Sequence, residues 1–372
     1  MILFLMKPTK RTSFLDMNSF YKNFIGGTHR FIPLMFSFFI AIFGYSISFA
    51  QWWEPQDTAV FVFGGDVMLA RNVGKILDTA GVDYPFAGIR DYLCKADCAV
   101  VNLESIVGTQ SKHADKKYVF QANPAALSGL LCAGVDAVSL ANNHIFDNFS
   151  AGITECLDSI RRSGIIPLGA GNNSDEFFAP RSFWFDGYWF SIIGLNDTRA
   201  GFWELDKPGC AITWTDWAES TAINRIATMN SLGATVIVFE HWGVEYDEEP
   251  CQRQIELAHR FIDAGARVVI GSHPHRLQGI EFYRSGVIAY SLGNLIFDQR
   301  DSLGNIGALL ELTFVDGYPD MVRILPTEML TNFAQPQPVL PDSFLEYFKN
   351  MSKSFGTNVR VEGNYFIFEP KK

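Results

Sequence analysis

Across residues 58–298 short apolar, β-branched runs alternate with amphipathic stretches, and this alternation constrains the fold more than any other feature of the chain. The runs are short enough for strands, and the stretches between them repeat apolar residues at helical spacing. Strands that alternate with helices build a layered α/β domain. The expected strands are 59–64, 98–103, 137–140, 235–240, 267–270 and 287–291, and the expected helices are 125–133, 150–162, 216–230 and 252–264.

Two further stretches predict antiparallel pairing. Within residues 181–193, two aromatic-rich runs flank Asp186-Gly187, a dipeptide that suits the tight turn of a hairpin. Later apolar runs at 309–314 and 321–325 are separated by the turn Gly317-Tyr318-Pro319 and followed by a proline-rich connector. We interpret this last region as an edge extension of the same domain.

Residues 1–50 have the order of a signal peptide or an N-terminal membrane anchor. Five basic residues and one acidic residue precede an apolar run at 31–50. Small residues at Ser48 and Ala50 fit a signal peptidase site, which predicts cleavage before Gln51. About twenty apolar residues are also enough to span a membrane, so a retained anchor is the alternative, with a buried core helix as a third. An exported domain would lie in the periplasm or on the outer face of the cytoplasmic membrane.

Charge excludes one class of partner. The chain holds 30 basic and 40 acidic residues, and residues 1–50 contribute five and one of these, so the remainder holds 25 against 39, a net charge of −14. Such a surface repels nucleic acid, whose binding depends on phosphate neutralisation, and no nucleic-acid partner is expected. The same balance argues against an electrostatic grip on any polyanion unless basic residues gather locally.

The six cysteines also limit the chemistry. None of them forms a Cys-x-x-Cys pair, which opposes a zinc ribbon or thioredoxin-like chemistry. In an oxidising compartment they would form one to three disulfides or remain buried thiols.

Five polar clusters follow predicted strands, at the edge where an α/β sheet gathers its ligand-binding loops. Together they offer carboxylate, amide and imidazole groups, which suit a divalent ion such as manganese, iron or zinc. We therefore expect the five loops to meet around one small volume. The clusters are Gly64-Gly65-Asp66-Val67-Met68, Asn102-Leu103-Glu104, Ala141-Asn142-Asn143-His144 with Asp147, Glu240-His241-Trp242-Gly243 and Gly271-Ser272-His273-Pro274-His275.

The order and identity of these clusters resemble the calcineurin-like metallophosphoesterases, and the surrounding sequence is similar to the CapA-type branch, the poly-gamma-glutamate capsule-synthesis family. The resemblance runs over about 60–299 and is most specific at 140–147, at 271–275 and at Tyr290-Ser291-Leu292-Gly293-Asn294. It implies an α/β fold of the metallophosphoesterase type, a four-layer α/β/β/α sandwich.

The resemblance also implies a metal centre within a domain of residues 51–372, whose best-matched core is 58–299. A metal there would lower the pKa of bound water, polarise the substrate, or both. The implied ligands are Asp66 on the first strand, Glu104 as a bridge between two metal positions, Asn143, His241 and His273 at one position, and His275 at the other.

Two departures from the phosphoesterase pattern bear on the metal count. Met68 stands where those enzymes carry a histidine, and a thioether is a poor ligand for a hard or borderline ion. Glu104 replaces the bridging aspartate. One ion, two ions or none therefore remain as alternatives. Each acid also has a structural alternative, since Asp66 could cap the following helix and Glu104 could lie on the surface.

The remaining candidates are catalytic and pocket residues. By the resemblance, His144 would be the imidazole near a leaving group, oriented by Asp147, because the ordinary pKa of histidine lies near neutrality. Trp242, Asn294 and Asp298 are candidates for the substrate pocket. Their structural alternatives are core packing for Trp242 and turn formation at a strand end for the other two.

By resemblance, the chain would be an exported cell-envelope protein in poly-gamma-glutamate or related capsule-polymer synthesis or export. Its site would be a metal-dependent hydrolase acting on an anionic or peptide-like polymer, with membrane polymer-synthesis or export proteins as partners. Two alternatives stay open. One is a non-catalytic scaffold for a membrane synthesis complex, which Met68 favours. The other is metal-independent acid–base chemistry on a peptide, such as epimerisation.

Overall fold

The computed structural model describes residues 58–185, 187–199, 204–299, 303–329, 334–339 and 342–371. The expected signal peptide or anchor at 1–50 lies outside the described residues, and so does Asp186 of the expected hairpin turn. Among the helices that are described, none is both long and apolar enough to cross a membrane.

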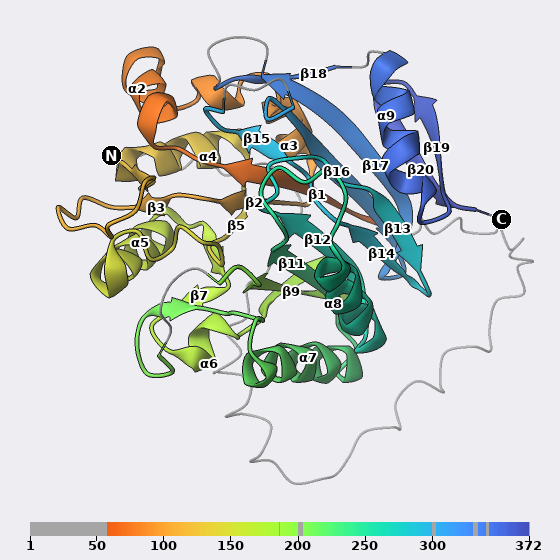
Figure 1. The fold of residues 1–372 in the computed structure, drawn as a ribbon, viewed down its shortest axis with the longest axis horizontal. Coiled ribbons are helices and arrows are strands. Elements are labelled where there is room, and N and C mark those ends of the chain that lie inside the picture. Colours follow the sequence, from red (N-terminus) through yellow and green to blue (C-terminus); the bar gives the residue numbers. More distant parts are fainter. Residues whose placement is uncertain are drawn as a thin grey trace, which may run out of the picture.

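Two β-sheets lie at the centre of the molecule, and helices cover their outer faces (Figure 1). In order across the first sheet the strands are β19 (Thr357–Glu362), β20 (Tyr365–Pro370), β17 (Tyr318–Met329), β16 (Ile306–Val315), β1 (Thr58–Val67), β2 (Cys98–Leu103), β5 (Ala137–Ser139) and β6 (Ile166–Leu168), with β15 (Asn294–Ile296) beside β1 and β18 (Pro336–Pro338) beside β17. Across the second they are β13 (Ile280–Tyr283), β14 (Gly286–Ala289), β12 (Ala266–Ser272), β11 (Thr235–His241), β9 (Tyr188–Asn196) and β8 (Arg181–Phe185).

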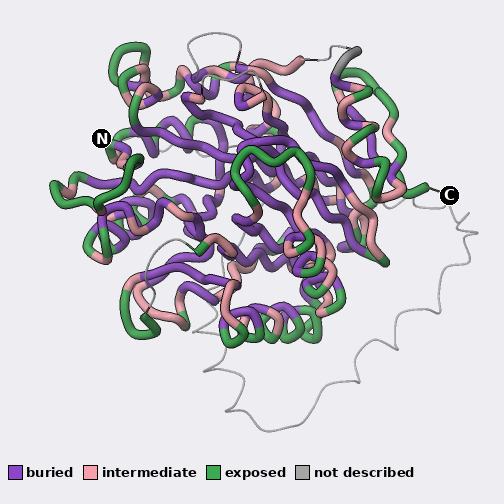
Figure 2. Tube along the Cα trace, in the orientation of Figure 1, coloured by how far each residue is buried: buried purple, intermediate pink, exposed green. Residues whose placement is uncertain are grey.

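Strand alternation separates the cores of the sandwich. In β1, Phe61 and Phe63 belong to the core between the sheets, whereas Val62 belongs to the core beneath the helices. In β11, Ile237 and Phe239 fill the same space between the sheets, and the rings of Phe63 and Phe239 lie 6.1 Å apart. Successive side chains of a strand face opposite ways, so both faces of each sheet are covered. Figure 2 shows the resulting buried centre and exposed outer helices.

Amphipathic helices complete the outer layers. The first sheet is covered by α2 (Arg71–Ala80), α3 (Arg90–Lys95), α4 (Leu127–Ala133) and α5 (Phe149–Ser163), and the second by α7 (Asp216–Ser231) and α8 (Gln252–Asp263). In α8 the buried face is formed by Leu257, Ala258, Phe261 and Ile262, the spacing expected of a helix that packs on a sheet. The α/β/β/α layering predicted from the sequence is confirmed.

The expected elements all form, with their ends shifted by a few residues. The hairpin at 181–193 forms as β8 and β9, and β16 and β17 extend the first sheet as expected. The expected turn is misplaced, because the chain reverses at Asp316 and Gly317, where φ is positive, and Pro319 already lies in β17. All six cysteines are free thiols, so no disulfide forms.

Candidate metal centre

Strand ends from both sheets meet at one point. Asp66 is the penultimate residue of β1, Glu104 directly follows β2, and His241 ends β11 in the opposite sheet. The amide of Asn102 joins the two sheets there, since its Nδ2 donates to Asp66 Oδ1 at 2.7 Å and lies 3.2 Å from His241 Nδ1. Because β1, β2 and β5 run parallel, as do β11 and β12, their carboxyl ends share an edge of each sheet. The loops expected to converge therefore lie together.

Two groups of buried side chains in the described chain are spaced to hold an ion, and they share one carboxylate. Within each group the ligand atoms lie within 4.8 Å of one another. Asn143 adjoins the first group, since its Oδ1 lies 3.1 Å from His241 Nε2. The groups are Glu104, His241 and His273, and Asp66, Glu104 and His275.

The surroundings of Glu104 fit a cation. Its side chain is completely buried, and neither carboxylate oxygen has a hydrogen-bond partner among the described residues. Burial, together with the negative charge of Asp66, raises the pKa of Glu104 well above its usual range. The buried Nδ1 of His273 also has no partner there. Buried polar groups without partners are costly, and a divalent ion would supply a partner to both side chains. The residues present therefore fit a metal.

The imidazoles are in the form that binds metals. Burial, followed by the charge of His275, lowers the pKa of His273 to about 3. Burial and the neighbouring histidines also lower the pKa of His241 well below its usual range. Both rings are therefore neutral near pH 7, with a lone pair available to an ion. Ser272 Oγ, 3.0 Å from His241 Nδ1, helps to fix that ring.

The loop after β12 is strained. His273 and His275 have φ of 98° and 55°, a region that costs side-chain-bearing residues about 1 to 3 kcal/mol each. Three contacts hold the loop: the backbone N–H of His273 donates to Asp66 Oδ2 at 3.3 Å, His275 Nδ1 lies 2.8 Å from Asn294 Oδ1, and the N–H of Tyr246 donates to the Pro274 carbonyl at 2.7 Å. This strained backbone places the imidazoles of both His273 and His275 beside Glu104.

The structural alternatives for the two acids are wrong. Helix α2 begins at Arg71 with Ala70 as its N-cap residue, so Asp66 does not cap it. Glu104 is buried rather than exposed. Met68 Sδ accepts a hydrogen bond from the N–H of Ala70 at 3.1 Å and belongs to the core. The position beside Asp66 consequently has fewer nitrogen donors than the position beside His241.

His144 and Asp147 form a buried dyad at the edge of this centre. His144 Nδ1 lies 2.6 Å from Asp147 Oδ2, and its ring stacks on Phe120 at a centroid distance of 3.9 Å. Asp147 also accepts from Lys116 Nζ at 2.6 Å and from the N–H of Phe120 at 2.7 Å. Burial lowers the pKa of His144, and Asp147 partly opposes this. Burial opposes ionisation of Asp147, but His144 and Lys116 outweigh it and lower its pKa.

The three expected pocket residues have different surroundings. The indole of Trp242 is fully buried and donates to the Tyr290 carbonyl at 2.9 Å, so its placement in a pocket wall is wrong and core packing is its role. Asn294 is buried and contacts His275, as described above. Asp298 is also buried and accepts from the N–H of Asn72 at 3.3 Å.

Sequence reasoning missed two residues of the site. Asn102 belongs to the predicted polar cluster Asn102-Leu103-Glu104, but the sequence assigned it no function in the site. Strand alternation nevertheless places it on the same face as Glu104. Lys116 pairs with Asp147 from the loop 108–120, where no strand end marks it. No sequence pattern identifies such a contact.

Known proteins are similar to this chain over most of its length. The family model described as "Bacterial capsule synthesis protein PGA_cap" matches residues 60–299, which include every residue of both ligand groups. The chain is 29% identical to the capsule biosynthesis protein CapA of Bacillus anthracis, over 73% of this chain and 68% of that protein. It is 28% identical to the PGA biosynthesis protein CapA of Bacillus subtilis, over 84% and 83%. A probable polyglutamine synthesis accessory protein of Mycobacterium tuberculosis is 27% identical, over 74% and 84%.

Proposed function

Since the chain belongs to the bacterial capsule synthesis family PGA_cap, we propose that it is an exported protein that cleaves or releases a capsule polymer at a metal-dependent hydrolytic site. The relatives named for CapA and for polyglutamine synthesis support the polymer, and the order of residues 1–50 supports export. The observation that carries the proposal is the buried carboxylate of Glu104, which lacks a partner among the described residues and lies between imidazoles.

The residues divide the work between binding and proton transfer. Glu104, His241, His273 and Asn143 would hold one ion, and Asp66 and His275 would complete a second position with Glu104. When bound, the ion would acidify a water molecule and polarise the bond to be cleaved. His144 Nε2 lies 3.8 Å from Glu104 Oε1, at the edge of the centre. From there, a proton carried by Nε2 would be transferred to the leaving group of a bound substrate. Asp147 fixes the ring through Nδ1.

Removing the metal tests this proposal. The full-length protein, kept in detergent because of its apolar N-terminal run, is expected to carry about one or two equivalents of manganese, iron or zinc. It should shorten poly-gamma-glutamate chains on a sizing gel, lose that activity in EDTA and regain it with the ion. The stripped protein should also melt at a lower temperature, because the ion binds only the folded state.

The alternatives give different results in the same assays. A metal-free protein that still alters the polymer but needs His144 would favour metal-independent acid–base chemistry. Capsule formation that survives both His144→Ala and His273→Ala in cells would favour a scaffold and contradict the hydrolase.

The dyad makes a separate prediction. Asp147→Asn is expected to lower the rate by about 100-fold or more, because an unanchored His144 transfers its proton poorly. Asp147 raises the pKa of His144, so its loss should lower that pKa and move the alkaline fall in rate to lower pH. Lys116→Met is the matched control: Lys116 lowers the pKa of His144, so its loss should move the fall to higher pH. Shifts of the pH–rate profile in the same direction for both variants would contradict this role.

A further inference from the structure

Basic side chains gather beside the candidate metal centre, although the whole chain has a net charge of −10. They come from helix α2 and from the loop 108–120, which joins β3 (Ile106–Val107) to β4 (Gln121–Ala122). The same two segments carry only two acids outside the site, Asp78 and Asp115. We call this set the basic strip; it consists of Arg71, Lys75, Lys112, Lys116 and Lys117.

Aromatic rings connect the basic strip to the dyad. The guanidinium of Arg71 lies 5.2 Å from the ring centroid of Tyr118 and 5.4 Å from that of Phe120. Phe120 in turn stacks on His144. Lys117 Nζ lies 4.9 Å from the Tyr118 ring, which is 48% exposed and so open to a ligand. The ring of Phe120 therefore lies between Arg71 and His144, the proposed proton donor.

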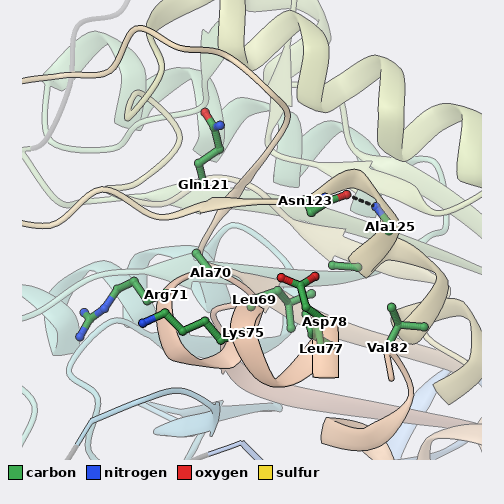
Figure 3. A pocket seen from close by; sticks show the side chains of 12 residues that line it. Leu69, Ala70, Arg71, Lys75, Leu77, Asp78, Val82, Gln121, Asn123 and Ala125 are labelled. Carbon is green, nitrogen blue, oxygen red and sulfur yellow. Dashed lines mark hydrogen bonds between the residues drawn. The ribbon is translucent and has the colours of Figure 1, made fainter. Parts of the chain in front are cut away.

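A cavity of about 230 Å³ adjoins the strip at Arg71 and Lys75, between α2 and the segment that follows β4. Arg71 and Lys75 lie side by side at one end of it, and Gln121 and Asn123 lie across from α2 (Figure 3). The Oε1 of Gln121 is buried and has no hydrogen-bond partner among the described residues. Two cations and two amides thus line a space large enough for a polymer side group, together with the acid Asp78, which lies farther along α2 from Arg71 (Figure 3).

The cations of the strip differ in whether they are already neutralised. Arg71 lies 3.3 Å from Asp298, and Lys116 pairs with Asp147, so these two adjoin the acids of the site. Within the described part of the chain, neither Lys75 nor Lys117 forms an ion pair; Lys75 Nζ contacts only the amide oxygen of Asn72, at 3.4 Å. Exposed lysines spaced along a strip suit a polymer that carries one carboxylate at regular intervals. A phosphate group is instead bound best by clustered guanidinium groups.

We propose that the basic strip is a subsite that holds carboxylates of an extended acidic polymer and guides the chain past Phe120 to His144. This proposal rests on the proposed function, because it names the residues that bind the polymer at that same site. Arg71 and Lys75 hold one carboxylate at the cavity, Lys117 and Tyr118 hold the next part of the chain, and Gln121 and Asn123 hydrogen-bond backbone amides. The acidic remainder of the surface repels the polymer, so binding is confined to this strip.

A binding experiment tests the strip without relying on turnover. Fluorescein-labelled poly-gamma-glutamate is titrated with the full-length protein in detergent, with EDTA present, and anisotropy is measured at about 50 and about 300 mM NaCl. The double variant Arg71→Gln/Lys75→Gln should bind roughly 5- to 30-fold more weakly at the lower salt, since each exposed ionic contact contributes modestly. The charge-preserving variant Arg71→Lys/Lys75→Arg should bind like the wild type.

The matched control removes the same charges elsewhere. Lys349 on α9 (Asp342–Lys353) and Arg360 on β19 are exposed, and both elements lie on the opposite side of the molecule from α2 (Figure 1). Lys349→Gln/Arg360→Gln should leave binding unchanged. Equal weakening by both double variants, or no weakening by the strip variant, overturns the proposal. So does equally tight binding of single-stranded DNA of the same charge, which would indicate a general anion surface.

The two proposals fail separately. The strip variant should keep the metal content and melting temperature of the wild type. A wild-type protein without metal or hydrolysis, whose polymer binding still depends on Arg71 and Lys75, would contradict the hydrolase and support the subsite. A protein that hydrolyses the polymer but binds it equally well after the strip substitutions would support the hydrolase and contradict the subsite.

Discussion

Replacing His273 with alanine is expected to lower the affinity for a divalent metal by about 100-fold or more and to abolish metal-dependent hydrolysis. Loss of a residue that only orients a ligand costs about 10- to 100-fold, so loss of a ligand should reach or exceed the upper end. His273 is also a neutral imidazole whose buried Nδ1 has no partner among the described residues. The substitution therefore removes a nitrogen donor that no nearby side chain replaces.

The measurement is metal content after gel filtration together with a competition titration against a fluorescent chelator. His259→Ala is the matched control, because His259 lies on α8, stacks on Tyr283 at 3.7 Å and pairs with Glu281 at 3.0 Å, outside both ligand groups. It should retain the wild-type metal content. Retention of metal by the His273 variant would remove this residue from the ligand set, and equal loss in both variants would indicate a general folding defect.

Gly271→Ala is expected to destabilise the protein by about 3 kcal/mol or more. A Cβ at this position would lie 1.9 Å from the Tyr290 carbonyl oxygen and 2.3 Å from Trp242 Nε1. Those two atoms are hydrogen-bonded to each other, so relief of the clash would break a buried contact. The backbone also approaches closely at Gly293, where φ is 62° and an added Cβ would lie 2.8 Å from the Ile306 carbonyl oxygen.

The urea midpoint of unfolding checks this prediction, and the slope of the transition should stay unchanged. Gly209→Ala is the matched control, since its Cβ would meet nothing closer than 3.5 Å and its midpoint should stay near that of the wild type. A Gly271 variant as stable as the control would show that β12 and the Tyr290 segment separate freely.

The layered fold and most of the site were predictable because both depend on strand ends. Apolar runs such as those containing Phe61 and Phe239 mark the sheets, and the polar residues that follow them are carried to one edge by parallel pairing. Contacts made by side chains from irregular loops carry no such pattern. Lys116 reaches Asp147 from a loop without periodicity, and Trp242 stands in a polar cluster although its indole belongs to the core.

The C-terminal strands β19 and β20 were not predicted. In β19, Thr357, Val359 and Val361 alternate with polar residues, but the run is short and only Thr357 is buried, so little of the strand belongs to the core. Its pairing with β20 is what makes it a strand. Composition likewise could not show where charges gather: a net charge of −10 is compatible with a local cationic surface, and only the placement of α2 against the loop 108–120 brings one together.

The two sheets contribute different donor atoms to the metal centre. Asp66, Glu104 and Asn143 lie at or after the ends of strands of the first sheet and offer oxygen, whereas His241, His273 and His275 lie at or after the ends of strands of the second and offer nitrogen. Of the candidate ligands, an emerging chain therefore presents only the oxygen donors until its second half has been synthesised. Binding of an ion that prefers nitrogen donors, such as zinc, would then require both halves to have docked, and would report that the sandwich has closed.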